Sequence, residues 1–122
     1  MFKPIRKLLF IDDEPSLLEL APLMFDEFEV LASDNGASII ELINDFQPDI
    51  ILIDLIMGNL NGLDVCETIR KQPEYKTLPL ILMTAGIIKP DSDLKGADGI
   101  IEKPFDMPKA SAMIQSFFEK RF

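Results

Sequence analysis

The sequence contains no histidine and only one cysteine. Histidine is the commonest general base and zinc ligand, so its absence excludes zinc hydrolases and the Ser-His and Cys-His nucleophile pairs. The single cysteine, Cys66, cannot form a disulfide within the chain, and we interpret it as a small buried hydrophobic residue because no cationic neighbour is evident. Catalysis that depends on histidine, and a fold that depends on internal disulfides, are both excluded.

Basic residues and long hydrophobic runs are also scarce. Twelve Lys and Arg against twenty-one Asp and Glu give a formal net charge of −9, which argues against DNA binding or anionic-membrane binding by this domain. The first apolar run, Leu8 to Ile11, stops at Asp12, and no run reaches membrane-spanning length. With 122 residues, 48% of them hydrophobic, we expect one globular, cytoplasmic domain without membrane insertion.

The stretch from Asp49 to Met57 is an apolar, β-branched run typical of a strand buried on both faces of a parallel sheet. Asp54 interrupts the run shortly before a turn-rich segment, which places its carboxylate at the carboxyl end of the strand. Shorter runs with the same character predict four more strands, at Lys7–Ile11, Glu29–Ala32, Leu80–Ala85 and Ile100–Ile101.

Helical spacing of apolar residues separates these strands. A first helix begins near Pro15, and its expected buried face consists of Leu17, Leu20, Ala21, Met24 and Phe28. Pro22 predicts that this helix is kinked or divided. Further helices are expected over 39–46, from residue 63 to about 71, and after Asp106, whereas the Gly86–Lys95 stretch leaves room for a fourth helix of about one turn.

Five alternations of strand and helix predict an α/β fold, with a doubly wound five-stranded parallel sheet flanked by helices on both faces. In such a sheet the carboxyl ends of the strands meet at one edge, where ligands bind. Polar side chains follow four of the predicted strands at that edge: Asp12, Asp13, Asp54, Thr84 and Lys103.

Three neighbouring carboxylates repel one another unless a cation compensates, and an all-oxygen site with few protein ligands favours Mg²⁺. We assign Asp12 and Asp13 to the metal, with Asp54 as a further ligand, and we assign Asp54 also to the role of a carboxylate nucleophile that forms an acyl phosphate. Lys103 would supply positive charge to the incoming phosphoryl group, and Thr84 a hydroxyl donor.

The ordered set Asp12-Asp13, Asp54, Thr84-Ala85 and Lys103-Pro104-Phe105 resembles the receiver domain of two-component response regulators, over nearly the whole chain. The resemblance implies a flavodoxin-like fold with strand order 2-1-3-4-5 and Mg²⁺-dependent transfer to Asp54 from a phosphohistidine. The donor would be a sensor histidine kinase or a histidine phosphotransfer protein. The resemblance also implies that the backbone carbonyl of Met57 ligates the metal and that Gly62 lets the following loop turn.

On this interpretation residues 1–122 are a single, stand-alone receiver domain that accepts a phosphoryl group, is not a turnover enzyme, and acts on an unknown downstream protein. Two departures from the family pattern affect the output. Ile100 stands where an aromatic residue is usual, so the ring movement of the family is doubtful. The stunted fourth helix indicates contact with one partner in place of the usual receiver dimer.

Three other functions compete with this interpretation. The first is a protein-interaction module that keeps the receiver fold and works without phosphorylation. The second is a flavodoxin, although Asp12, Asp13 and Glu14 would repel a flavin phosphate. The third is a phosphatase resembling haloacid dehalogenases, whose nucleophile and acid lie two residues apart, a spacing that Asp12 and Glu14 imitate poorly.

Overall fold

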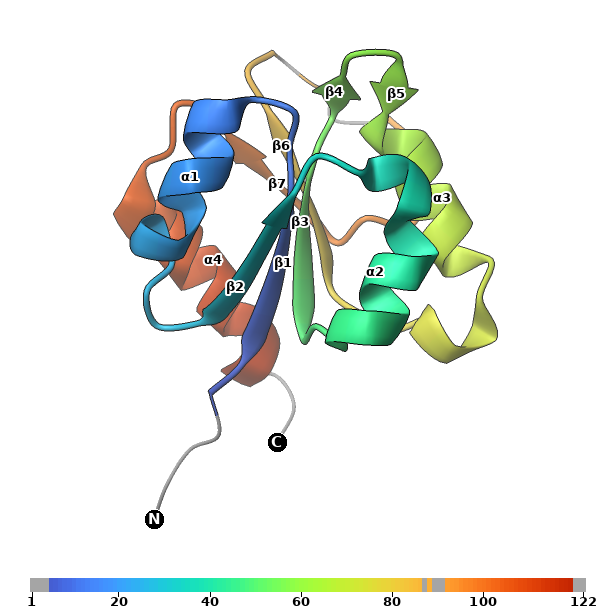
Figure 1. Ribbon diagram of the computed structural model, residues 1–122, viewed down its shortest axis with the longest axis horizontal. Helices are drawn as coiled ribbons and strands as arrows, with labels where there is room; N and C mark the ends of the chain where they lie inside the picture. Colours follow the sequence, from blue (N-terminus) through green and yellow to red (C-terminus); the bar gives the residue numbers. More distant parts are fainter. Residues whose placement is uncertain (1–4, 87, 89–91, 120–122) are drawn as a thin grey trace.

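Five parallel strands form the central sheet of the computed structural model, which describes residues 5–86, 88 and 92–119 (Figure 1). Their spatial order is β2-β1-β3-β6-β7, which confirms the predicted order 2-1-3-4-5 when only strands of this sheet are numbered. The strands are β1 (Lys7–Ile11), β2 (Glu29–Ser33), β3 (Ile50–Asp54), β6 (Leu80–Thr84) and β7 (Gly99–Glu102).

Helices cover both faces of the sheet, as predicted. Figure 1 shows α1 (Pro15–Met24) and α4 (Met107–Glu119) on one face, and α2 (Ile39–Phe46) and α3 (Gly62–Arg70) on the other. Successive strand residues alternate between two hydrophobic clusters: Leu8 and Phe10 pack with α1 and α4, whereas Leu9 and Ile11 pack with α2 and α3. Burial on both faces explains why β1, β3 and β6 lack polar alternation.

The first helix is continuous, so the predicted division is wrong, while the alternative of a kink at Pro22 stays a prediction. Pro22 lies inside α1, two residues before its end at Met24, so the missing N–H weakens only the last turn and does not divide the helix. Two residues of the expected buried face are placed differently. Leu20 is 46% exposed, and Phe28 lies beyond the helix, where it is buried against the cluster of α1 and α4.

The central strand is shorter than predicted. β3 ends at Asp54, and the next residues form a separate antiparallel hairpin of β4 (Ile56–Met57) and β5 (Leu60–Asn61). Gly58 has a φ of +57° at the first central position of its two-residue turn, the position at which type II′ turns favour glycine. This hairpin stands above the carboxyl edge of the sheet, beside the end of β3 (Figure 1).

The connection between β6 and β7 contains no helix among its described residues, which are 85, 86, 88 and 92–98. Pro90, on which the expected shortening partly depended, lies outside the described residues. The last helix begins as predicted, because the Asp106 carboxylate accepts a hydrogen bond from the Lys109 N–H at 3.3 Å. Within the described residues, every helix is too short or too polar to cross a membrane.

Candidate functional site

The carboxyl edge of the sheet brings together side chains from distant parts of the chain. Asp12 follows β1, Asp54 ends β3 and Lys103 follows β7. The Lys103 ammonium lies 2.6 Å from Oδ2 of Asp12 and 3.1 Å from Oδ1 of Asp54. One half-buried cation thus bridges two carboxylates, at the edge where the predicted strand ends were expected to bring these side chains together.

A group of three carboxylates occupies the same edge. One oxygen from each of Asp12, Asp13 and Asp54 lies within 4.8 Å of the others. Asp12 is fully buried, and its Oδ1 accepts a hydrogen bond from the Glu14 N–H at 3.1 Å, whereas Asp13 is exposed. Carboxylate oxygens at this spacing are suitable ligands for a hard divalent cation. These residues could therefore hold a metal ion, as predicted for this trio.

The predicted fourth ligand is the backbone carbonyl of Met57. Met57 lies in β4, three residues beyond Asp54, and its side chain is only 5% exposed. Its role as a metal ligand stays a prediction.

Burial and charge shift the ionisation of the bridged pair. Desolvation raises the pKa of Asp54, and the charges of Asp12 and Asp13 raise it further, against the opposing effect of the hydrogen bond from Lys103. Desolvation lowers the pKa of Lys103, but its hydrogen bonds to Asp12 and Asp54 raise it more, so the net shift is upward. Lys103 is therefore cationic at neutral pH, and the ionised form of Asp54 is destabilised in the folded protein.

This shift predicts that Asp54→Asn becomes more stable, relative to the original protein, as the pH rises from about 4 to 7 without metal. A raised folded-state pKa of Asp54 gives stability that is present below its unfolded value, near 3.8, and is lost as the pH rises through the folded pKa. Asparagine does not ionise, so Asp54→Asn does not lose this stability as the pH rises. Urea denaturation in a chelating buffer, at several pH values, measures the difference. A difference that does not change with pH would contradict this prediction.

Thr84 lies at the same edge but its side chain makes a local contact. The Thr84 hydroxyl oxygen accepts a hydrogen bond from the Gly86 N–H at 3.0 Å, and the residue is 5% exposed. Its backbone carbonyl accepts a hydrogen bond from the Lys103 N–H at 2.8 Å. Thr84 is thus joined to the site through the backbone of Lys103, while its hydroxyl is engaged with Gly86.

Gly62 has a role that the sequence did not indicate. Its predicted role was to let a loop turn, yet a Cβ on Gly62 would lie 2.3 Å from the backbone oxygen of Asp54 and 3.0 Å from the Cα of Leu55. The Gly62 N–H also donates to the Leu55 carbonyl at 2.7 Å. Glycine is therefore needed because the start of α3 contacts the backbone that carries Asp54.

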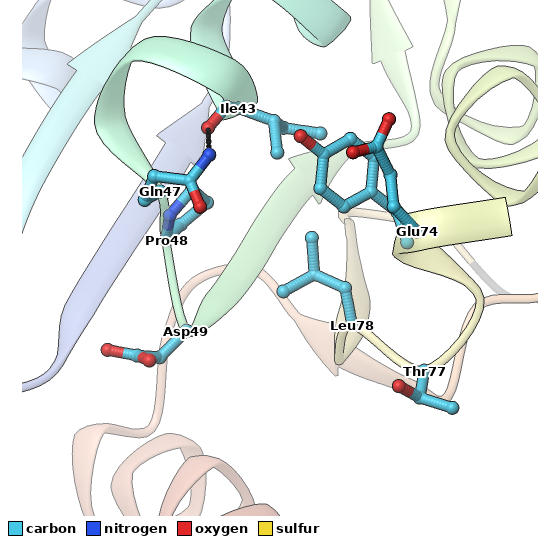
Figure 2. Close-up of a pocket in the computed structure, with 8 residues that line it drawn as sticks. Ile43, Gln47, Pro48, Asp49, Glu74, Thr77 and Leu78 are labelled. Carbon is cyan, nitrogen blue, oxygen red and sulfur yellow. Dashed lines mark hydrogen bonds between the residues drawn. The ribbon is translucent and has the colours of Figure 1, made fainter. Parts of the chain in front are cut away.

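A hollow of about 220 Å³ lies at the opposite, amino edge of the sheet (Figure 2). Figure 2 shows the Gln47 side chain donating to the Ile43 carbonyl, at 3.3 Å, and the Asp49 carboxylate pointing away from Leu78. That carboxylate accepts a hydrogen bond from the Lys7 N–H at 2.7 Å. The Asp49 carboxylate is therefore engaged by the backbone and turned away from the hollow, which Glu74 also lines.

Comparison with known proteins identifies relatives of this chain. The family model described as response regulator receiver domain matches residues 8–115. The DNA-binding response regulator MtrA of Mycolicibacterium smegmatis is 28% identical over an alignment of 116 residues, which covers 91% of this chain and 50% of MtrA. The chain thus spans half the length of that curated relative.

Solved structures show the same fold at lower identity. The chemotaxis response regulator CheY4 of Vibrio cholerae has a TM-score of 0.83 and 22% identity, with 93% of this chain and 99% of CheY4 covered. The receiver domain of a signal transduction histidine kinase from Syntrophus aciditrophicus has a TM-score of 0.81 and 23% identity, with 95% and 92% covered.

Proposed function

The chain belongs to the family of response regulator receiver domains, and on that premise we propose that it is a phosphorylatable receiver of a two-component or phosphorelay system. In this proposal Asp54 accepts the phosphoryl group. The observation that supports it best is the Lys103 ammonium, which lies within 3.1 Å of Asp54 and 2.6 Å of Asp12. A carboxylate nucleophile, an adjacent cation and neighbouring carboxylates are the groups that acyl phosphate formation requires.

The proposed reaction is a transfer from a phosphohistidine. An Asp54 oxygen attacks the phosphorus in line, the P–O bond forms, the P–N bond breaks, and the imidazole nitrogen keeps the electron pair of that bond. The Lys103 ammonium balances charge on the phosphoryl oxygens in a loose transition state. No proton has to be removed from the nucleophile, which agrees with a chain that lacks histidine.

We assign the metal site to Asp12, Asp13 and Asp54, with the backbone carbonyl of Met57 as a further ligand, and the ion to Mg²⁺. When bound, Mg²⁺ would supply positive charge that offsets the three carboxylates and the phosphoryl oxygens. The oxygen ligands of this trio, together within 4.8 Å, support that assignment.

The proposed switch starts at Thr84. Among the described residues, its hydroxyl forms hydrogen bonds with the backbone of Gly86, and a phosphoryl group on Asp54 would offer it a stronger, charge-assisted partner. Movement of Thr84 toward that group would shift the start of the β6–β7 connection and bias a pre-existing two-state equilibrium.

We further propose that residues 1–122 form one cytoplasmic receiver domain that is not a turnover enzyme. Its partners would be a sensor histidine kinase or a histidine phosphotransfer protein, and a downstream protein of unknown identity. An interaction module that works without phosphorylation is the second candidate. The half-buried Ile100, which packs against the cluster of α2 and α3 in place of a movable ring, favours it.

The intact mass of the protein, measured after incubation with acetyl phosphate, tests the proposed function. We expect a gain of one phosphoryl group that requires Mg²⁺, and no gain in Asp54→Asn, which keeps the shape of the side chain but lacks the nucleophile. No gain with acetyl phosphate or phosphoramidate would contradict the proposal and favour the interaction module.

A further inference from the structure

Arg70, the last residue of α3, binds two separate loops at the amino edge of the sheet. Its Nη1 donates to the carbonyl oxygens of Tyr75 and Leu78, at 2.8 and 2.7 Å, in the loop before β6. Its Nε donates to the Gly96 carbonyl at 2.9 Å, and Nη2 lies 3.0 Å from the Asp98 carboxylate, just before β7. A single guanidinium therefore joins four oxygens from two loops.

Two features of Arg70 favour these contacts, although the Asp98 side chain is 40% exposed. The side chain is only 17% exposed, and the planar guanidinium holds its donors in a fixed geometry that a lysine lacks. The approach is close, because a Cβ on Gly96 would lie 2.6 Å from Cγ of Arg70, and Gly96 has a φ of +92°. Glycine at this position therefore permits both the contact and the backbone conformation.

Asp98 extends the arrangement into the sheet. Its Oδ2 also accepts a hydrogen bond from the N–H of Leu80, the first residue of β6, at 2.9 Å. The Asp98 N–H donates to the Leu80 carbonyl at 2.7 Å. The start of β6, the end of the connection and the end of α3 are therefore linked through Arg70 and Asp98.

This arrangement lies where the chain shows no helix among its described residues. The β6–β7 connection leaves the carboxyl edge at Thr84 and reaches the amino edge before Gly99. Among its described residues, Leu94 and Ala97 pack against the cluster of α2 and α3. The hydrogen bonds to Arg70 therefore add to the attachment that these two partly buried apolar side chains give.

We propose that Arg70 is a positioning residue that fixes Gly96–Asp98 in the same place whether or not Asp54 carries a phosphoryl group. A rearrangement that begins at Thr84 would then end before Gly96, and the amino edge would not respond. The first part of the proposal, that Arg70 fixes Gly96–Asp98, concerns the folded chain alone. The second part, that phosphorylation of Asp54 does not move this segment, rests on the proposed function.

Amide hydrogen exchange of the unphosphorylated protein tests the first part. In Arg70→Ala we expect exchange of the Leu80 and Asp98 amides to accelerate by about tenfold or more, because charge-assisted contacts that hold their partners are lost. Lys71→Ala, a change of the exposed next residue with the same effect on net charge, serves as the matched control. Equal exchange in the two variants would overturn the proposal.

The second part is tested after phosphorylation with acetyl phosphate, with occupancy read from the intact mass. In the original protein we expect amides at 84–86 to change their exchange and those at 96–98 to change by less than about twofold. In Arg70→Lys, which keeps the charge but not the fork of donors, the amides at 96–98 should respond as well. A response at 96–98 in the original protein, equal to that at 84–86, would overturn the proposal.

These experiments separate the two proposals. A protein that gains no phosphoryl group contradicts the proposed function, while the comparison of Arg70→Ala with Lys71→Ala still decides whether Arg70 holds the loops together.

Discussion

Lys103→Met is expected to lower the rate at which Asp54 accepts a phosphoryl group by about a hundredfold. The side chain of Lys103 is 15% exposed and lies within hydrogen-bond distance of two carboxylates, of which Asp12 is fully buried. Methionine fills a similar volume without charge, so the phosphoryl oxygens lose the cation that balances their charge. Intact mass against time, with acetyl phosphate and Mg²⁺ in excess, gives the rate.

The same substitution is expected to lower the free energy of unfolding by about 3 kcal/mol without metal, since it leaves buried carboxylates without their cation. Mg²⁺ should restore much of the stability but not the rate. Lys109→Met, an exposed change on α4, is the control and should alter neither quantity. A rate for Lys103→Met within about twofold of the control would show that Lys103 has no part in the transfer.

Gly62→Ala is expected to destabilise the protein by about 3 kcal/mol or more, the upper range for overpacking of a core. The new methyl group would lie 2.3 Å from the backbone oxygen of Asp54 and 3.0 Å from the Cα of Leu55. Both neighbours are backbone atoms, so α3 and the end of β3 would have to separate. The higher helix propensity of alanine, worth about 1 kcal/mol, is too small to compensate.

Urea denaturation of Gly62→Ala and Gly86→Ala measures this effect against a matched control. Among the described residues, a Cβ on Gly86 would meet the Thr84 hydroxyl oxygen at 3.7 Å, which is an ordinary contact. We therefore expect Gly86→Ala to change the stability by less than about 1 kcal/mol. Equal stabilities of the two variants would mean that the contact between Gly62 and Asp54 relaxes without cost.

The sequence predicted β1, β3 and β6 because burial on both faces makes each of them an apolar run that leads into a polar residue. The edge strands β2 and β7 are only partly buried and were predicted from shorter apolar runs. Asp12, Asp54 and Lys103 were placed correctly at one edge for the same reason, since strand ends fix their positions along the sheet. The family resemblance supplied the strand order, which alternation alone does not determine.

The features that the sequence did not predict depend on contacts between distant segments or on single backbone angles. The β4–β5 hairpin has strands of two residues each, too short for any periodicity, and depends on the φ of Gly58. The close approach of Gly62 to Asp54, and the four oxygens around Arg70, exist only after α3 has packed on the sheet. Contacts of this kind leave no local pattern in the sequence from which they could be predicted.

The bridge from Lys103 to Asp12 has a consequence for biosynthesis, because its two residues are 91 positions apart in the chain. Each parallel pairing of the sheet closes a long loop, and a topology of high contact order folds slowly. During translation Asp12, Asp13 and Asp54 leave the ribosome well before Lys103. While β7 and Lys103 are still inside the ribosome, the nascent chain carries these carboxylates without their cation. The site therefore becomes complete only after the last strand has joined the sheet.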